Sequence, residues 1–280
     1  LVPNPTYPIH AFGFVISGAT IRHLPLEEGG DFFAVLDRAV ANSHPTPKAL
    51  VLNFPANPTA EVVDLAFYKE AVAYAKKHDI ILLSDLAYSE IYFDDNAPPP
   101  SILQIDGAKD VAVEFTSLSK TFSMPGWRMG FAVGNERLIG ALTRIKSYLD
   151  YGAFTPIQVA ASAALDSPEE VIRDIRNVYK ERRDVLIDVF SRAGWDVPSP
   201  QATMFAWARI PPLFESMTSL EFSSLLLQES DIAVSPGIGF GEYGDNHVRI
   251  ALVENEQRIR QAGRNLRRFM EEHSEKWKTA

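Results

Sequence analysis

Short apolar runs alternate with longer helical patterns through the first half of the chain. The run at 48–55 is typical of a buried strand that ends at a proline, and the runs at 80–85, 110–117 and 129–135 are three further strand candidates. Gly, Pro, Asn or Asp, which favour turns, flank these runs. Strands that alternate with helices predict an α/β domain with three layers, in which helices cover both faces of a mostly parallel sheet.

The segment at 61–79 predicts a helix in this half of the chain. Its apolar residues recur at helical spacing, whereas Lys69, Lys76 and Lys77 lie off the apolar stripe. The stripe consists of Leu65, Tyr68, Val72 and Ala75. We expect this face to pack against the sheet.

From residue 135 onward the pattern is mainly helical. Helices are predicted at 136–150, 157–166 and 167–194. The last of them has Ser167 as a candidate N-cap and Gly194 just past its end, where a glycine commonly stops a helix.

The C-terminal part mixes strands with helices. Strands are predicted at 204–210 and 247–253, separated by a helix near 219–229 and a glycine-rich loop at 235–246. A charged amphipathic helix is expected from 256 to about 277.

The change of pattern near residue 165 predicts two domains. Residues 1–165 would form the α/β domain, and residues 166–280 a smaller α+β domain. With 280 residues, of which 46% are hydrophobic, the chain is long and apolar enough to bury a substantial core.

Composition and charge narrow the possible partners. A formal net charge of −9, without a basic run, disfavours binding to nucleic acid and to acidic membrane surfaces. The absence of cysteine from the sequence excludes disulfides and thiolate chemistry. No apolar run approaches the length of a membrane span and no signal peptide is apparent, so we expect a soluble cytoplasmic protein.

Polar residues follow three of the predicted strands. They are Asn53 and Asn57 after the first, Asp85 and Tyr88 after the second, and Ser117, Ser119 and Lys120 after the third. Ligands bind at the carboxyl ends of strands in an open parallel sheet. Taken singly, Lys120 is typical of a surface amine and Asn57 of a turn, but the whole set indicates a binding site.

Other polar and aromatic residues are weaker candidates. The six histidines, His10 among them, are scattered without the spacing of metal ligands, so we predict no metal site. Four aromatic residues of the C-terminal part are interpreted as core rather than as a cofactor pocket. They are Phe205, Trp207, Phe214 and Phe222.

Four motifs occur in a fixed order along the chain: NFPANPTA at 53–60, SDLAYSEIYF at 84–93, SLSKTFSMPGWRMGF at 117–131 and HVRIALVEN at 247–255. This series resembles that of the class I aminotransferases, which are pyridoxal-phosphate enzymes of fold type I, and the resemblance runs over the whole chain. The stretches LVPNPTYPIH, IKSYLDYGAFTP and VSPGIGFGEYGD are most similar to bacterial glutamate–pyruvate (alanine) transaminases.

The resemblance implies pyridoxal 5'-phosphate as cofactor. Lys120 matches the lysine that holds the cofactor as a Schiff base and later acts as general base, roles that require a low pKa. Asp85 matches the carboxylate that pairs with the pyridinium nitrogen. Asn57 and Tyr88 match the residues that hydrogen-bond the 3'-oxygen of the ring, and Asn57 is also expected at the substrate.

The remaining matches concern the phosphate, the ring face and the substrate. Arg128, Ser119 and Ser117 match residues that bind the cofactor phosphate. Tyr7 matches the aromatic residue that stacks on the pyridine ring; considered alone, it is typical of a core residue beside a turn. Arg249 matches the residue that grips the substrate α-carboxylate, although considered alone it could point to solvent from its strand.

The chain departs from the family pattern in two places. The family normally carries an N-terminal segment before the position of Leu1, with a dimer arm and a glycine-rich turn that binds phosphate. We therefore expect an N-terminally truncated large domain with an open sheet edge. Ala60 stands where many relatives have glycine, and we expect a negative φ there.

The resemblance implies an aminotransferase with a ping-pong cycle between pyridoxal and pyridoxamine phosphate. Its substrates would be small amino acids and 2-oxo acids, with alanine and 2-oxoglutarate giving pyruvate and glutamate as the leading reaction. One alternative is an aromatic or methionine aminotransferase, or a carbon–sulfur lyase, with the same cofactor. Another is a non-catalytic fragment. Because sites of this family lie at a dimer interface, a homodimer is also implied.

Overall fold

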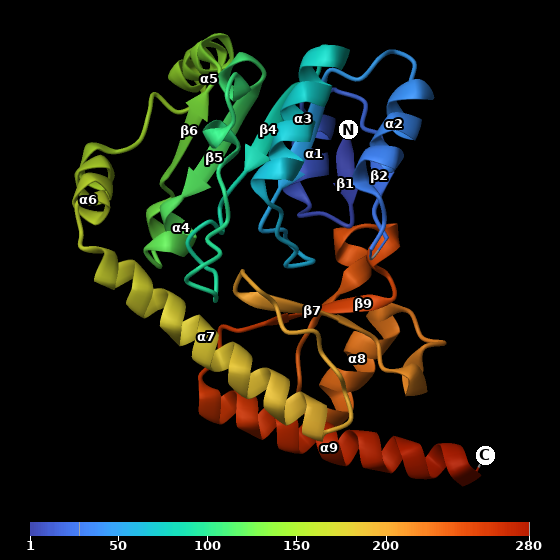
Figure 1. Cartoon of the computed structure of the whole chain (residues 1–280). Helices are drawn as coiled ribbons and strands as arrows, with labels where there is room; N and C mark the ends of the chain where they lie inside the picture. The colour runs from blue at the N-terminus through green and yellow to red at the C-terminus, as the bar shows by residue number, and fades with distance from the viewer. Residues whose placement is uncertain (28, 280) are drawn as a thin grey trace.

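The strands form three sheets within residues 1–27 and 29–279, the part of the chain that the computed structural model describes (Figure 1). The strand order is β1-β2 in the first sheet, β3-β4-β5-β6 in the second and β7-β9-β8 in the third. The strands are β1 (Val2–Asn4), β2 (His23–Pro25), β3 (Ala49–Asn53), β4 (Ile81–Asp85), β5 (Ala112–Ser117), β6 (Gly130–Gly134), β7 (Phe205–Arg209), β8 (Ser235–Pro236) and β9 (His247–Ala251).

Helices connect most of these strands. The α-helices are α1 (Ile9–Ile16), α2 (Phe32–Ala41), α3 (Leu65–His78), α4 (Leu118–Thr121), α5 (Glu136–Leu149), α6 (Thr155–Leu165), α7 (Glu169–Arg192), α8 (Ser219–Ser230) and α9 (Glu256–Thr279). The 3-10 helices are η1 (Ile102–Gln104), η2 (Ala108–Asp110), η3 (Pro125–Trp127), η4 (Pro212–Phe214), η5 (Gly237–Phe240) and η6 (Glu242–Gly244).

The four-stranded sheet is mostly parallel, as the sequence predicts. β3, β4 and β5 run parallel to one another, with Asn53 opposite Asp85 and Asp85 opposite Phe115. β6 is antiparallel to β5. The carboxyl ends of the three parallel strands therefore meet at one edge of the sheet, where Asn53, Asp85 and Ser117 end their strands.

Helices lie on both faces of this sheet. Successive residues of a strand point to opposite faces. On β4, the Asp85 side chain meets His10 of α1, whereas Leu82 and Ser84 face the other way, and Leu82 lies in one buried cluster with Tyr68 of α3. The three-layer α/β/α arrangement expected from the sequence is confirmed.

Local capping explains where the helices start. Asp64 accepts a hydrogen bond from the Phe67 amide at 2.9 Å, so α3 begins at Leu65, four residues later than the pattern predicts. Leu65 is exposed rather than on the buried stripe, while Tyr68, Val72 and Ala75 are buried as expected.

The expected N-cap of α7 is wrong. Pro168 precedes the first helical residue, Glu169, and its ring offers no side-chain acceptor. The Ser167 hydroxyl instead donates to the carbonyl of Ala164, at the end of α6. Gly194 does lie just past the end of the helix, with a positive φ of 89°.

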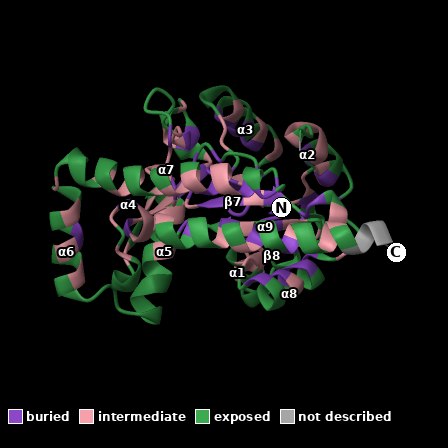
Figure 2. Cartoon of the chain, turned by 90° about the horizontal axis from the view of Figure 1, so that it is seen from below, coloured by how far each residue is buried: buried purple, intermediate pink, exposed green. Residues whose placement is uncertain are grey.

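The buried apolar side chains form two main clusters. One is drawn from residues 1–112 around the first two sheets, and the other from residues 186–269 around the third sheet. Figures 1 and 2 show α7 and α9 side by side beneath the third sheet. A domain boundary near residue 165 stays a proposal; it falls in the short link between α6 and α7.

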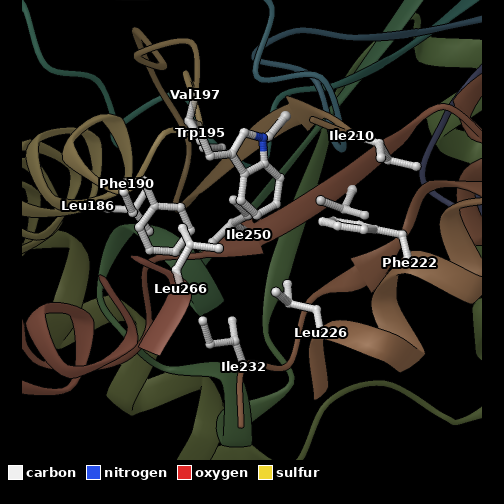
Figure 3. Close-up of a cluster of buried hydrophobic side chains, with 14 of the residues drawn as sticks. Leu186, Phe190, Trp195, Val197, Ile210, Phe222, Leu226, Ile232, Ile250 and Leu266 are labelled. Carbon is white, nitrogen blue, oxygen red and sulfur yellow. The ribbon is translucent and has the colours of Figure 1, made fainter. Parts of the chain in front are cut away.

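Aromatic rings fill the second cluster (Figure 3). The ring of Trp195 stacks on Phe190 at 5.7 Å and meets the edge of Phe222 at 5.4 Å. Phe214 and Phe222 belong to this core, as the sequence predicts. The Trp195 indole N–H donates to the carbonyl of Arg209, so its polar atom is satisfied.

No helix in the described residues is long and apolar enough to cross a membrane.

We expect Phe222→Ala to lower the free energy of unfolding by about 3–5 kcal/mol, because it opens a cavity against Trp195 in the core. Phe222 is 0% exposed, whereas Leu220 on the same helix is 58% exposed. The matched control Leu220→Ala should cost about 0.5 kcal/mol or less. Urea denaturation measures both variants, and equal losses would contradict the packing described.

Candidate active site

Lys120 lies on a single turn of helix that directly follows β5. The Ser117 hydroxyl oxygen caps this turn by accepting a hydrogen bond from the Ser119 amide at 3.1 Å. Lys120 is half-buried, and its Nζ lies 5.7 Å from the centroid of the Tyr88 ring. The cap and the turn thus place the Lys120 amine near the ring of Tyr88, which lies in the loop after the neighbouring strand β4.

The surroundings of Lys120 disfavour its protonated form. Partial burial lowers the pKa of Lys120 from its ordinary value, and the positive charges of Arg249 and Arg128 lower it further. An amine with a lowered pKa is unprotonated in a larger fraction of molecules, and only the unprotonated amine is a nucleophile.

Asp85 ends β4 and is held by a buried chain of hydrogen bonds. Its Oδ2 is 2.9 Å from His10 Nε2, and His10 Nδ1 is 2.8 Å from the hydroxyl of Thr6. The Oδ1 atom accepts from the amide of Ala87. Because both oxygens have donors, the orientation of the carboxylate is fixed before any ligand binds.

Arg249 lies on β9, in the C-terminal three-stranded sheet, whereas Lys120 and Asp85 come from the four-stranded sheet. Its Nη1 donates to Asn57 Oδ1 at 2.9 Å, and its Nη2 donates to the Ser235 hydroxyl at 3.4 Å. The guanidinium lies between two rings, 5.0 Å from the centroid of Phe205 and 4.6 Å from that of Phe240. Burial lowers the pKa of Arg249 from its ordinary value.

Among the residues that the structure describes, the Nε atom of Arg249 is buried and has no hydrogen-bond partner. A buried donor of a charged group that is left unpaired is costly. An anion that bonds this edge of the guanidinium would remove the cost, so the atom is consistent with a carboxylate-binding position.

Tyr88 is buried between the two halves of the site. Burial raises the pKa of its hydroxyl well above the ordinary value, an effect that Arg249 opposes. The hydroxyl is therefore neutral and able to donate a hydrogen bond. Its ring meets the edge of Phe205 at 5.4 Å.

Asn57 is tied to the strand ends by Asn53. The amide N–H of Asn57 donates to Asn53 Oδ1 at 2.9 Å, and Asn53 Nδ2 donates to the backbone carbonyl of Asp85 at 2.9 Å. The side chain of Asn53 thus fixes the loop that presents Asn57 relative to the end of β4.

Two of the residues predicted for the site lie at its periphery. Arg128 is exposed, and its Nη1 donates to the carbonyl of Pro125 at 2.9 Å, although its charge still acts on Lys120. Tyr7 is 43% exposed and meets His10 edge-on at 5.9 Å. Ser119 is half-buried next to Lys120, and its amide donates a hydrogen bond to the Ser117 hydroxyl.

The cations of the site are bonded to neutral partners. Arg249 bonds an amide and a hydroxyl, and Arg128 bonds a carbonyl. These hydrogen-bond partners carry no negative charge, and the positive charges of both arginines act on Lys120. Such a site favours anionic ligands.

The sequence pattern does not mark His10 and Phe205 as site residues. His10 bonds Asp85, which lies 75 positions away, so the local sequence shows just one part of this arrangement: Thr6 and His10 are four residues apart, the spacing of one helical turn. The sequence predicts Phe205 to be core. It is buried, but its ring faces Arg249 and Tyr88, a role that only the pairing of β7 with β9 reveals.

The expected backbone conformation of Ala60 is wrong. Its φ is +59°, in the left-handed region that glycine adopts without strain. Ala60 is buried in one small cluster with Tyr88 and Phe205. The Cβ of alanine is therefore accommodated at a strained position that forms the wall of the site.

In the described part of the chain, no group of three or more His, Asp or Glu side chains is placed to hold a metal ion.

The sequence pattern described as aminotransferase class I and II matches residues 1–265. AatC of Rhizobium meliloti (strain 1021), whose name says aminotransferase and gives no substrate, is 66% identical over 270 residues. The glutamate–pyruvate aminotransferase AlaC of Escherichia coli (strain K12) is 55% identical over 267 residues. These matches cover 96% and 95% of this chain but 66% and 65% of the two relatives, so the chain spans about two thirds of their length.

An LL-diaminopimelate aminotransferase of Natranaerobius thermophilus is 42% identical over 93% of this chain and 67% of its own length. Among solved structures, the aromatic aminotransferase of Pyrococcus horikoshii OT3 matches with a TM-score of 0.90 and 28% identity, covering 98% of this chain and 73% of that one. The fold is therefore that of the fold type I aminotransferases.

We expect Arg249→Met to raise the pKa of Lys120, because the substitution removes a positive charge that disfavours the protonated amine. The pKa should stay below the ordinary lysine value, since burial, the larger cause, remains. The pH at which Lys120 is half-maximally acylated, read by mass spectrometry of its peptide, measures the effect. Arg264→Met, on α9, is the matched control. An unchanged or lower labelling pH in Arg249→Met would contradict the charge coupling.

Proposed function

The chain belongs to the class I and II aminotransferases, and we propose on that premise that it transfers amino groups between small amino acids and 2-oxo acids with pyridoxal 5'-phosphate as cofactor. The observation that carries the proposal is the environment of Lys120. Its amine has a lowered pKa and is acted on by two arginines whose hydrogen bonds, within the described residues, go to neutral groups. An unprotonated amine is the nucleophile that captures an aldehyde, and nearby positive charge favours the phosphate that this aldehyde carries.

The residues present fit the cofactor by their chemistry. Lys120 supplies the amine for its aldehyde, and Asp85 a carboxylate for its ring nitrogen. Tyr88 offers a neutral hydroxyl and Asn57 an amide for the ring oxygen. Ser117, Ser119 and Arg128 would bind the phosphate, and Tyr7, still partly exposed, would cover the ring face.

When bound, pyridoxal phosphate supplies an electron sink for the α-carbon of the substrate. The chain supplies the proton transfer and the positioning. Lys120 Nζ, unprotonated more readily than an ordinary lysine, would take the α-proton and return it. Arg249 would hold the α-carboxylate, with its guanidinium plane fixed between the rings of Phe205 and Phe240.

Asp85 would act through its fixed negative charge. The hydrogen bond from His10, 7% exposed, and the amide of Ala87 orient the carboxylate toward one position. A carboxylate at the ring nitrogen favours the protonated ring and so strengthens the electron sink.

For the substrates we propose alanine with 2-oxoglutarate, giving pyruvate and glutamate. The name and the 55% identity of the Escherichia coli relative support this choice. LL-diaminopimelate is the second candidate amino donor, supported by the relative from Natranaerobius thermophilus at 42% identity. A cytoplasmic location stays a prediction from the sequence.

We further propose a homodimer. Large apolar side chains are exposed on α1 and on the segment from α5 to α6, where Tyr151 is 92% exposed; Figure 2 shows α5 and α6 mostly exposed. The exposed set comprises Ile9, Phe12, Ile16, Tyr148, Leu149, Tyr151 and Phe154. A surface of this kind is typical of a protein interface.

We expect the 280-residue chain mixed with pyridoxal phosphate to gain the visible absorption of a covalently held cofactor, and Lys120→Ala to lose it. Amino transfer should fall by roughly 10²–10⁴-fold in Lys120→Ala, the usual contribution of a general base. Lys77→Ala, on α3, is the matched control and should behave like wild type. Equal absorption in Lys120→Ala and wild type would overturn the assignment.

The dependence on an amino acceptor separates the alternatives. A transferase forms pyruvate from alanine continuously only when a second 2-oxo acid is present, because the amino group otherwise stays on the cofactor. A carbon–sulfur lyase would form its 2-oxo acid without any acceptor. Comparing alanine, LL-diaminopimelate, methionine and phenylalanine as donors to 2-oxoglutarate ranks the candidate substrates.

A further inference from the structure

Thr203 has an unusual backbone for its residue type. Its φ is +76°, in the left-handed region, and its side chain is 0% exposed. A β-branched residue is disfavoured in this region and persists there only where the surroundings hold it. Thr203 lies two residues before Phe205, just before β7 begins.

Two hydrogen bonds hold Thr203 in place. Its amide N–H donates to the carbonyl of Ile91 at 2.7 Å, and its hydroxyl donates to the carbonyl of Phe205 at 3.0 Å. The amide of Ile91 in turn donates to the carbonyl of Tyr88 at 3.1 Å. Thr203 therefore joins the turn that carries Tyr88 to the strand that carries Phe205.

The hydroxyl satisfies a carbonyl that has no partner on the neighbouring strand. The amide of Leu252 donates to the carbonyl of Met204, and backbone groups along an antiparallel pair point alternately toward and away from the partner strand. The carbonyl of Phe205 thus faces away from β9, on the open side of β7, which is an edge strand. A carbonyl buried there needs a donor, and Thr203 provides it.

The ring of Phe205 then sets the position of Arg249. It meets the Tyr88 ring at 5.4 Å on one side and supports the guanidinium of Arg249 at 5.0 Å on another. Ala60, with its own positive φ, belongs to the same buried cluster. Two residues with a positive φ that are not glycine therefore neighbour Phe205: Thr203 bonds its carbonyl, and Ala60 shares its buried cluster.

We infer that Thr203 is a positioning residue: its left-handed backbone and its hydroxyl fix Phe205, and through the Phe205 ring they hold the guanidinium of Arg249 in the orientation that binds a carboxylate. The carboxylate-binding role of Arg249 rests on the proposed function. The placement of Arg249 beside Lys120 does not, and it can be measured separately.

Variants of Thr203 distinguish the effect of its hydroxyl from general effects on folding. Thr203→Gly relieves the backbone strain but removes the hydroxyl and the restriction on the backbone. Thr203→Ser keeps the hydroxyl. Asp231→Gly, which relieves a positive φ of 56° at the end of α8, is the matched control for strain relief alone.

The first measurement uses the acylation of Lys120 and needs no cofactor. If Thr203 holds Arg249 near Lys120, Thr203→Gly moves the half-maximal labelling of Lys120 to higher pH, in the same direction as loss of the Arg249 charge. Thr203→Ser and Asp231→Gly should label at the wild-type pH. An unchanged labelling pH in Thr203→Gly, or an equal shift in Thr203→Ser, overturns the inference. Should Thr203→Gly fail to fold, Thr203→Ala removes the same hydroxyl and makes the same test.

The second measurement uses the chain loaded with pyridoxal phosphate. Thr203→Gly should raise the KM for the amino acid and for the 2-oxo acid by about five-fold or more, the usual effect of one lost hydrogen bond. Capture of the cofactor by Lys120 should stay within about two-fold of wild type at a pH above the labelling midpoints of both chains, where the amine is unprotonated in both. The hydrogen bonds of Thr203 go to Ile91 and Phe205 rather than to the groups expected to bind the cofactor. Loss of cofactor capture in the wild-type chain would contradict the proposed function and leave the labelling result to decide on Thr203.

Discussion

The hydrogen bond from Arg249 to Asn57 joins two parts of the chain that are 192 residues apart in sequence. Arg249 stands on β9 of the C-terminal sheet, and Asn57 on the loop after β3 of the N-terminal sheet. Asn53 extends the connection from Asn57 to the end of β4, where Asp85 stands. This contact between a guanidinium and an amide, together with the bond from the Thr203 amide to the carbonyl of Ile91, sets the relative position of the candidate substrate and cofactor groups.

Electrostatics explains why Arg249 and Arg128 are hydrogen-bonded to neutral groups in the candidate site. A carboxylate bonded to Arg249 or beside Lys120 would compete with an anionic ligand and raise the pKa of Lys120. Amide, hydroxyl and carbonyl groups bond the arginines without neutralising them. The carboxylate of Asp85 is hydrogen-bonded to His10 rather than to the arginines. Its negative charge therefore stays at one defined position.

The sequence predicts the sheet well because apolar runs bounded by turn residues mark β3, β4 and β5, and parallel strands bring their ends together. Asp85, Asn57 and Lys120 could be proposed for that reason. The pairing of His10 with Asp85 could not, since it joins positions 75 apart. The positive φ values of Ala60 and Thr203 could not be predicted either, because neither residue is a glycine. The helix start was predicted too early because the capping role of Asp64 was not evident from the apolar pattern.

Lys120 is the proposed attachment point of pyridoxal phosphate. Borohydride reduction of the chain after incubation with the cofactor, followed by digestion and mass spectrometry, maps the modified lysine directly. We expect one dominant modified peptide that contains residues 118–128, with the cofactor on Lys120. Modification spread over exposed lysines, or concentrated on a lysine outside the site, would contradict it.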